Sequence, residues 1–160
     1  AGADPVWAAA GGVSSVLVES AVQVSLGGAT IPFDSSKPQI TEGAHITQLE
    51  CSVTPTQAGT RIDVLLDTFI GGVAGTYCVA LFKNSVTDAV ATNFLQIANQ
   101  TNAPHMFSIR YSTSTSNTDP IQFSVRAGNA AGTDTLFNMG ESASIGGGTI
   151  ISSIRLTEYS

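Results

Sequence analysis

The carboxylates Asp63 and Asp67 are the residues of this chain best suited to acid–base chemistry. They stand four residues apart in an alternating apolar and polar run, 61–68. Paired carboxylates act as general acid and as base or nucleophile in glycoside hydrolysis. However, four residues of a strand span about 13 Å, whereas glycosidase carboxyl groups lie within about 9.5 Å of each other. We therefore interpret the pair as two solvated acids on an outer strand face.

Motifs for other kinds of catalysis are missing from the sequence. His45 and His105 are isolated, and no Gly-x-Ser-x-Gly segment presents a serine nucleophile. The triple glycine at 146–148 leads into a strand-like run, whereas phosphate-binding loops lead into a helix. Asn99 begins an Asn-Gln-Thr glycosylation sequon, a pattern so short that it is common by chance. We expect no enzymatic activity.

Cys51 and Cys78 are the two cysteines, and each lies in an apolar stretch. We expect two buried thiols that pack as small hydrophobic groups. A single disulfide is the alternative, if the two strands are neighbours with facing Cβ atoms. A zinc site needs four ligands, and two cysteines with two distant histidines lack the spacing of one. We expect no metal and no cofactor.

Charged residues are scarce for a chain of 160 residues. They make up 11% of the sequence, against about 25% in average globular proteins. This composition suits an extracellular β-protein or a subunit that hides much of its surface, because the centres of interfaces are depleted in charge. The net charge of −6 and the scatter of the six basic residues along the chain argue against nucleic acid as a partner.

Alternating patterns divide most of the chain into strands and turns. Residues 16–26, 61–68 and 105–112 each put apolar side chains on one face and polar side chains on the other. Residues 76–82 are apolar nearly throughout, which indicates a strand covered on both faces. Only residues 85–98 leave room for a helical turn. About eight to ten strands without alternating helices predict one all-β domain, a β-sandwich or jelly roll.

The chain ends on a strong strand pattern that follows the glycines at 146–148. Residues 149–160 are rich in β-branched side chains, which favour a half-buried strand. Chain ends fray unless something ties them down. We therefore expect this strand to dock inside a sheet and to lock the fold.

The ending Ser152-Ser-Ile-Arg-Leu-Thr-Glu158 resembles the ends of phage tail-fibre and tail-needle knobs. Further short motifs that resemble the distal domains of phage tail proteins occur in order along the chain: Gly11-Gly-Val-Ser-Ser15, Pro38-Gln-Ile-Thr-Glu-Gly43, Arg61-Ile-Asp-Val64 and Val125-Arg-Ala-Gly128. The chain as a whole resembles the tail-needle knobs of podoviruses. The resemblance implies a homotrimeric jelly roll like that of tumour necrosis factor and the complement globular heads. Residues 1–12 would then be an extension or a junction to a stalk, and residues 13–160 the knob domain.

The function implied by this resemblance is that of a virion protein at the distal tip of the tail. It would mediate host attachment or envelope penetration as a trimeric knob. Its partners would be further copies of itself, a host cell-surface glycan or outer-membrane component, and a small molecule at the subunit interface. The alternative is a bacterial surface or secreted jelly-roll module that binds carbohydrate or has a structural role.

Three groups of residues are candidates for these contacts. A strand that is apolar on both faces needs two covers, whereas an isolated sandwich has one interior, so the strand at 76–82 is a candidate for an intersubunit face. The candidates for the trimer interface are Tyr77, Val79, Leu81 and Phe82 in this strand, together with Phe107, Tyr111 and Ile151. Polar loop residues are candidates for the receptor-facing surface: Asn84, Asp88, Asn117, Asp119 and Asn129. Arginines are candidates for holding a small ligand at the subunit interface: Arg61, Arg110 and Arg126.

Overall fold

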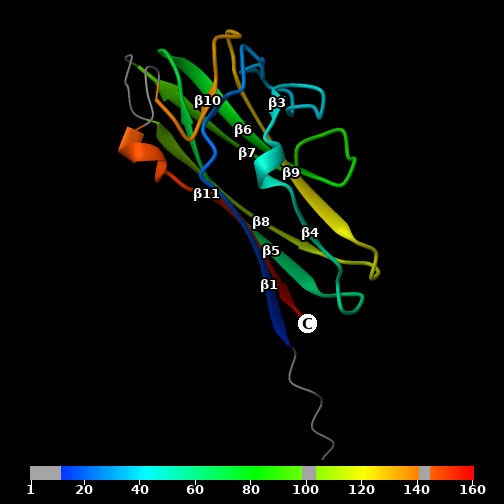
Figure 1. Ribbon diagram of the computed structural model, residues 1–160. Coiled ribbons are helices and arrows are strands. Elements are labelled where there is room, and N and C mark those ends of the chain that lie inside the picture. Colours follow the sequence, from blue (N-terminus) through cyan, green and yellow to red (C-terminus); the bar gives the residue numbers. More distant parts are fainter. Residues whose placement is uncertain (1–11, 99–103, 141–144) are drawn as a thin grey trace, which may run out of the picture.

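The computed structural model describes residues 12–98, 104–140 and 145–160, and its regular elements are almost all strands (Figure 1). The strands are β1 (Val13–Ser20), β2 (Val24–Ser25), β3 (Ala44–His45), β4 (Cys51–Val53), β5 (Arg61–Gly71), β6 (Gly75–Lys83), β7 (Ala91–Ile97), β8 (His105–Ser114), β9 (Ile121–Asn129), β10 (Leu136–Phe137) and β11 (Ser152–Tyr159). Two short 3-10 helices, η1 (Thr47–Leu49) and η2 (Ile145–Gly148), complete the described part. Neither helix is long and apolar enough to cross a membrane.

The strands form two antiparallel sheets that pack face to face. In the first sheet β1, β11, β5 and β8 lie side by side, and the short β2 and β10 extend the same sheet. In the second sheet β3 and β4 both pair with β9, which is followed by β6 and β7. With β3 and β4 counted as one interrupted strand, and β2 and β10 set aside, the chain order of the strands is 1-8-3-6 in one sheet and 2-7-4-5 in the other. This is the strand order of a jelly roll, so the predicted all-β class and fold are confirmed.

The core lies between the two sheets and follows from the alternation of the strands. In β5 the buried side chains of Ile62, Val64 and Leu66 point inward, and the residues between them point outward. The same alternation holds in β8, β9 and β11. Burial of these apolar side chains is the main force that holds the two sheets together.

The C-terminal strand β11 lies between β1 and β5, as predicted from its sequence. Ile154 is paired with Val18 on one side and with Leu66 on the other, and it is fully buried. The strand starts at Ser152, later than the pattern suggested, and the triple glycine belongs to η2 instead of a simple turn. The last residue is held as well, because Ser160 N–H donates to the Gly12 carbonyl at 3.0 Å.

Two local expectations differ from the structure. The predicted strand at 16–26 is interrupted between β1 and β2, because the side-chain amide of Asn138 donates to the carbonyls of Ser20 and Val22 at 2.8 and 3.1 Å. The amide thus takes up acceptors that a continuous strand would offer to a neighbour. Residues 85–98, which left room for a helical turn, contain the strand β7. The predicted junction at 1–12 lies outside the described residues except for Gly12, and the Asn99 sequon lies outside them altogether.

Strand β6 is covered on both faces, as predicted, but both covers belong to the same chain. Phe82 lies on the face of β6 that points away from the sandwich interior, in a second apolar cluster with Ile31 and Ala89. Residues 29–43 and 84–90 form this cover. They are joined by hydrogen bonds from Ile40 N–H to the Thr87 carbonyl (2.8 Å) and from Ala89 N–H to the Pro38 carbonyl (2.9 Å).

This second cover corrects the prediction of the trimer interface. Five of its candidates are already buried within the single chain, so no second copy can reach them: Tyr77, Val79, Leu81, Phe82 and Phe107. Tyr111 is half-buried at the seam between the sheets, and Ile151 is 49% exposed. The roles of these two residues in an interface stay predictions.

Cys51 and Cys78 are free and buried, as expected. They cannot form a disulfide, because Cys51 points into the sandwich interior and Cys78 into the second cluster on the opposite face of the same sheet. Burial raises the pKa of the Cys51 thiol. Burial, followed by the Glu42 carboxylate, raises the pKa of Cys78 to about 12. Both thiols are therefore protonated and unreactive at neutral pH.

Candidate functional site

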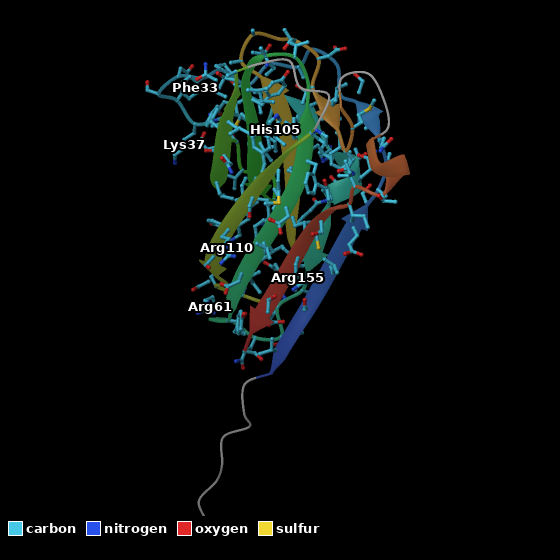
Figure 2. All side chains as sticks on the ribbon, turned by 90° about the vertical axis from the view of Figure 1, so that its left-hand side faces the viewer. Phe33, Lys37, Arg61, His105, Arg110 and Arg155 are labelled. Atoms are coloured by element: carbon cyan, nitrogen blue, oxygen red, sulfur yellow. The ribbon has the colours of Figure 1, made fainter. Side chains whose placement is uncertain are left out.

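The outer face of the first sheet carries arginine side chains from three neighbouring strands. Leu65 of β5 is paired with Arg155 of β11 on one side and with Arg110 of β8 on the other. Adjacent strands lie about 4.8 Å apart, so the two arginines flank Leu65 across the sheet. Arg61 lies on the same face, at the end of the sheet where β5 begins (Figure 2). We call this surface the arginine face.

Arg61 is held in place by two neighbours on the arginine face. Its Nη2 lies 3.0 Å from the Asp63 carboxylate, and its Cζ lies 4.4 Å from the centroid of the Tyr159 ring. Within the described ranges, neither Arg110 nor Arg155 has an ion-pair partner. These two guanidinium groups are free to bind an anion or the acidic side chain of another protein chain.

A shallow hollow of about 340 Å³ opens on the arginine face. Its lining combines the two arginines with hydroxyl and aromatic groups and one carboxylate, and includes Asp63, Arg110, Ser112, Arg155, Thr157 and Tyr159. The hollow can thus take hydrogen-bond acceptors from a ligand or from a partner surface.

The structure brings together two of the three predicted ligand-binding arginines. Arg61 and Arg110 share the arginine face, whereas Arg126 lies on β9 in the other sheet. Arg126 Nε and Nη2 donate to the carbonyls of Glu42 and Gly43 at 2.7 and 2.8 Å, and burial lowers the pKa of Arg126. Its guanidinium therefore fixes β3 against β9 and is not available to a ligand, which corrects that prediction. Sequence reasoning missed Arg155, although the alternation of β11 already placed it on the outer face.

The predicted receptor-facing residues separate into three places. Asn84, Asn117 and Asp119 line one polar hollow of about 220 Å³. Asn84 also has a structural role there, because it has a positive φ of 54° and its Oδ1 accepts a hydrogen bond from Gln122 N–H at 2.9 Å. Asp88 is exposed beside a different groove. Asn129 is completely buried, and its Oδ1 accepts from Ala131 N–H at 2.7 Å, so it cannot face a receptor.

The groove next to Asp88 lies along β7 at the edge of the second sheet, reaches Tyr111 of β8 in the first sheet, and has an aromatic wall. It has a volume of about 460 Å³, and its lining includes Lys37, Asp88 and Phe94. Phe33 packs edge-on against Phe94, with ring centroids 5.2 Å apart. We call this site the aromatic groove. Figure 2 shows Phe33 and Lys37 close together, well away from the three arginines.

The carboxylates and histidines considered for catalysis do not assemble into a site. Asp63 and Asp67 both point outward from β5, and Asp63 is bound to Arg61. His45 Nε2 lies 3.0 Å from the Glu50 carboxylate, in a pair at the surface. In the part of the chain that the structure describes, no cluster of three or more His, Cys, Asp or Glu side chains is arranged to hold a metal ion.

Comparison with known proteins shows similarity of fold alone. No family model and no curated protein matches the sequence. Among solved structures, dimeric latent PorU from Porphyromonas gingivalis matches 99% of this chain and 14% of its own chain, with a TM-score of 0.51 and 10% identity. The present chain therefore spans only a small part of PorU.

Two further solved structures are less similar. Eiger TNF from S. frugiperda matches 91% of this chain and 93% of its own, with a TM-score of 0.46 and 11% identity. The C-terminal domain of EclA, a sugar-binding protein, matches 78% and 75%, with a TM-score of 0.38 and 17% identity. At these identities none of the three assigns a function to the chain.

Proposed function

We propose that the chain is a non-enzymatic attachment domain at the distal tip of a phage tail needle or tail fibre, and that it works as a homotrimer. The resemblance of its short sequence motifs to those of phage tail-needle and tail-fibre knobs supports the viral context. The jelly-roll strand order supports the knob architecture. The single observation that carries the trimer is the character of the arginine face.

The arginine face has the composition of a protein interface. Exposed apolar side chains lie on its strands β1 and β11: Val13 is 66% exposed, Leu17 44% and Tyr159 40%. Leu17 is paired with Arg155 and so continues the row of Arg155, Leu65 and Arg110 across the sheet. Aromatic residues and arginine are enriched in interfaces, whereas a solvated sheet face is normally polar.

The charges of the arginine face are balanced within the face itself. Glu19 and Asp67 lie two residues along their strands from the row that contains Arg155 and Arg110. A neighbouring copy would present the same acids, so each unpaired arginine has an acidic partner available across an interface between copies. Packing of three copies through this face would give three equal attachment surfaces, which raises avidity without new contacts.

The two ends of the sandwich have different roles in this proposal. β1 begins and β11 ends at one end, as the register between Val13 and Tyr159 requires (Figure 1). Ser114 lies in the same row, so the polar hollow that contains Asn117 is at this end too. A stalk that precedes β1 would approach from here. The loops between β5 and β6 and between β9 and β10 lie at the opposite end, away from such a stalk.

Binding to bacteria tests the attachment function. Fluorescently labelled protein is expected to bind cells of the phage's host saturably and to compete with phage adsorption. A mutant host strain that resists the phage at the adsorption step is the matched control. If the protein shows no saturable binding to sensitive cells and does not delay phage adsorption, it is not an attachment domain.

A bacterial surface or secreted carbohydrate-binding module is the second candidate function, and the aromatic groove favours it. The coding sequence upstream of residue 1 distinguishes the two. A coiled coil supports a needle or fibre, whereas a catalytic region or Gly-x-y repeats support a bacterial module.

A further inference from the structure

Phe33 is a large apolar side chain that is both exposed and held in position. It is 67% exposed, and its ring meets Phe94 at an interplanar angle of 60°. The turn that carries it is fixed by Asp34, whose Oδ1 accepts hydrogen bonds from Ser36 N–H at 2.7 Å and from the Ser36 hydroxyl at 2.5 Å. A phenyl ring in such a position offers a preorganised apolar surface to a ligand.

The two walls of the aromatic groove are joined at their base. Besides the two backbone hydrogen bonds between residues 38–40 and 87–89, the Gln39 side-chain amide donates to Asp88 Oδ1 at 3.1 Å. Ala89 is buried beneath the groove in the second apolar cluster, and Phe94 packs against that cluster. The groove is thus preformed, and a ligand would not have to order its walls on binding. Its volume lies in the range of small-molecule sites, about 300–1,000 Å³.

The polar groups of the groove define the kind of ligand it can take. Lys37 supplies a donor and Asp88 an acceptor, and Ser36 and Thr92 add hydroxyl groups. One positive and one negative charge cancel, so the site has no preference for a charged ligand. A ligand that fits must combine an apolar face for the aromatic wall with several hydroxyl groups that both donate and accept. A neutral pyranose ring has both features.

We infer that the aromatic groove binds a neutral sugar ring, with the ring stacked beside Phe94, which lines the groove and packs against Phe33, and with its hydroxyl groups bound by Lys37 and Asp88. This inference rests on the proposed attachment function and deepens it, because it names the chemical class of the host molecule. Phe33 and Lys37 lie well away from the three arginines (Figure 2), whereas Tyr111 lines both the groove and the hollow on the arginine face.

Nuclear magnetic resonance of the isotope-labelled full chain tests the groove. The probes are methyl glycosides of glucose, galactose and mannose and methyl N-acetylglucosaminide, each added to millimolar concentration. At least one is expected to shift the amide signals of residues 33–37 and 86–92 in a saturable way. If all four leave these signals unchanged, or if the shifts lie elsewhere, the inference is wrong.

Variants identify the contacts of the sugar that shifts these signals. Phe33→Ala removes the ring that packs against Phe94 and is expected to weaken binding about tenfold. Phe33→Trp should keep binding, and Asp88→Asn should weaken it. Met106→Ala removes a similarly exposed apolar side chain outside the groove and should change nothing. Equal binding by Phe33→Ala and the unchanged protein would overturn the inference.

The sugar titration and the cell-binding experiment fail independently. If the protein binds host cells saturably and Phe33→Ala binds equally well, the attachment function stands and the groove is not its sugar site. If a sugar occupies the groove but no cells are bound, the groove inference stands and the attachment function fails. Shifts caused only by an added peptide, and by no glycoside, would identify a peptide-binding groove and overturn the inference.

Discussion

Glu158 accepts hydrogen bonds from both the backbone N–H and the hydroxyl of Thr56, at 2.6 and 2.7 Å. Ser14 donates a third hydrogen bond to the same carboxylate at 3.2 Å. Glu158 is 2% exposed, so these bonds replace the water that the carboxylate loses on folding. One buried acid thereby ties the loop after β4 and the edge strand β1 to the C-terminal strand.

The first prediction concerns acid sensitivity. The hydrogen bonds from Thr56, followed by that from Ser14, hold the pKa of Glu158 below its ordinary value of 4.5. A carboxylate with a lowered pKa in the folded state adds stability above its unfolded pKa, and this contribution is lost as pH falls through the folded pKa. Stability should therefore decline below about pH 4.5.

Urea unfolding across the acid range measures this contribution. Glu158→Ala should lose about 2–3 kcal/mol of unfolding free energy at neutral pH. The unfolding free energy of Glu158→Gln should fall less in acid than that of the unchanged protein. The control Glu19→Gln, at an exposed site on β1, should show the same fall as the unchanged protein. Identical acid profiles for Glu158→Gln and the unchanged protein would contradict the role of this carboxylate.

The second prediction separates two isoleucines of the C-terminal segment. Ile154 is fully buried between the sheets, and Ile151 is 49% exposed just before the strand. Ile154→Ala should lower the unfolding free energy by about 2–5 kcal/mol, and Ile151→Ala should change it by no more than about 0.5 kcal/mol. Comparable losses for both variants in urea unfolding would show that β11 is not placed as described.

The third prediction concerns Asn138, a buried residue with a φ of 56°. Its amide nitrogen donates to Ser20 and Val22, and its Oδ1 accepts from the Ser152 hydroxyl at 2.6 Å. Asn138→Gly removes these bonds and should cost about 2–3 kcal/mol. Asn138→Ala should cost about 1 kcal/mol more, since alanine disfavours a positive φ. Thermal unfolding of both variants measures these losses. An Asn138→Ala protein of unchanged stability would contradict the structural role of Asn138.

The fourth prediction is that the protein carries no disulfide and that its thiols are shielded. In the native state Cys51 and Cys78 should react with an aromatic disulfide reagent only at the rate of unfolding, because burial keeps them protonated. After denaturation without reductant, both thiols should titrate. A denatured sample without titratable thiol would contradict the opposite-face placement.

Local patterns in the sequence were enough to predict the strands with clear alternation. The inward positions of Ile62, Val64 and Leu66 follow from their spacing alone, and the burial of β6 on both faces follows from its apolar run. The cover of β6 could not be predicted, because Ile31 lies in a segment without strand periodicity and is placed by hydrogen bonds to distant loops. The break at Val22 is caused by Asn138, which lies 116 residues away in the sequence.

The candidate surfaces were harder to predict than the strands. Arg110 and Arg155 become neighbours only because β5 lies between β8 and β11, and strand order is set by the whole jelly roll. The aromatic groove likewise joins two loops whose contact is tertiary. Residue types alone indicated arginines and polar loops, but they could not indicate which of them share a face.

The fifth prediction concerns the arginine face. Leu17→Lys puts a positive charge beside Arg155 in a position that is 44% exposed, so the chain should still fold. In a trimer built through this face, the added charge should drive the copies apart. Val22→Lys, at a residue 49% exposed outside the face, is the matched control and should leave assembly unchanged.

Multi-angle light scattering at micromolar concentration tests the trimeric attachment domain most directly. The chain mass is 16.4 kDa, and we predict a particle of about three times this mass for the unchanged protein and for Val22→Lys, and a single chain for Leu17→Lys. A mass of 16.4 kDa for the unchanged protein would contradict the account.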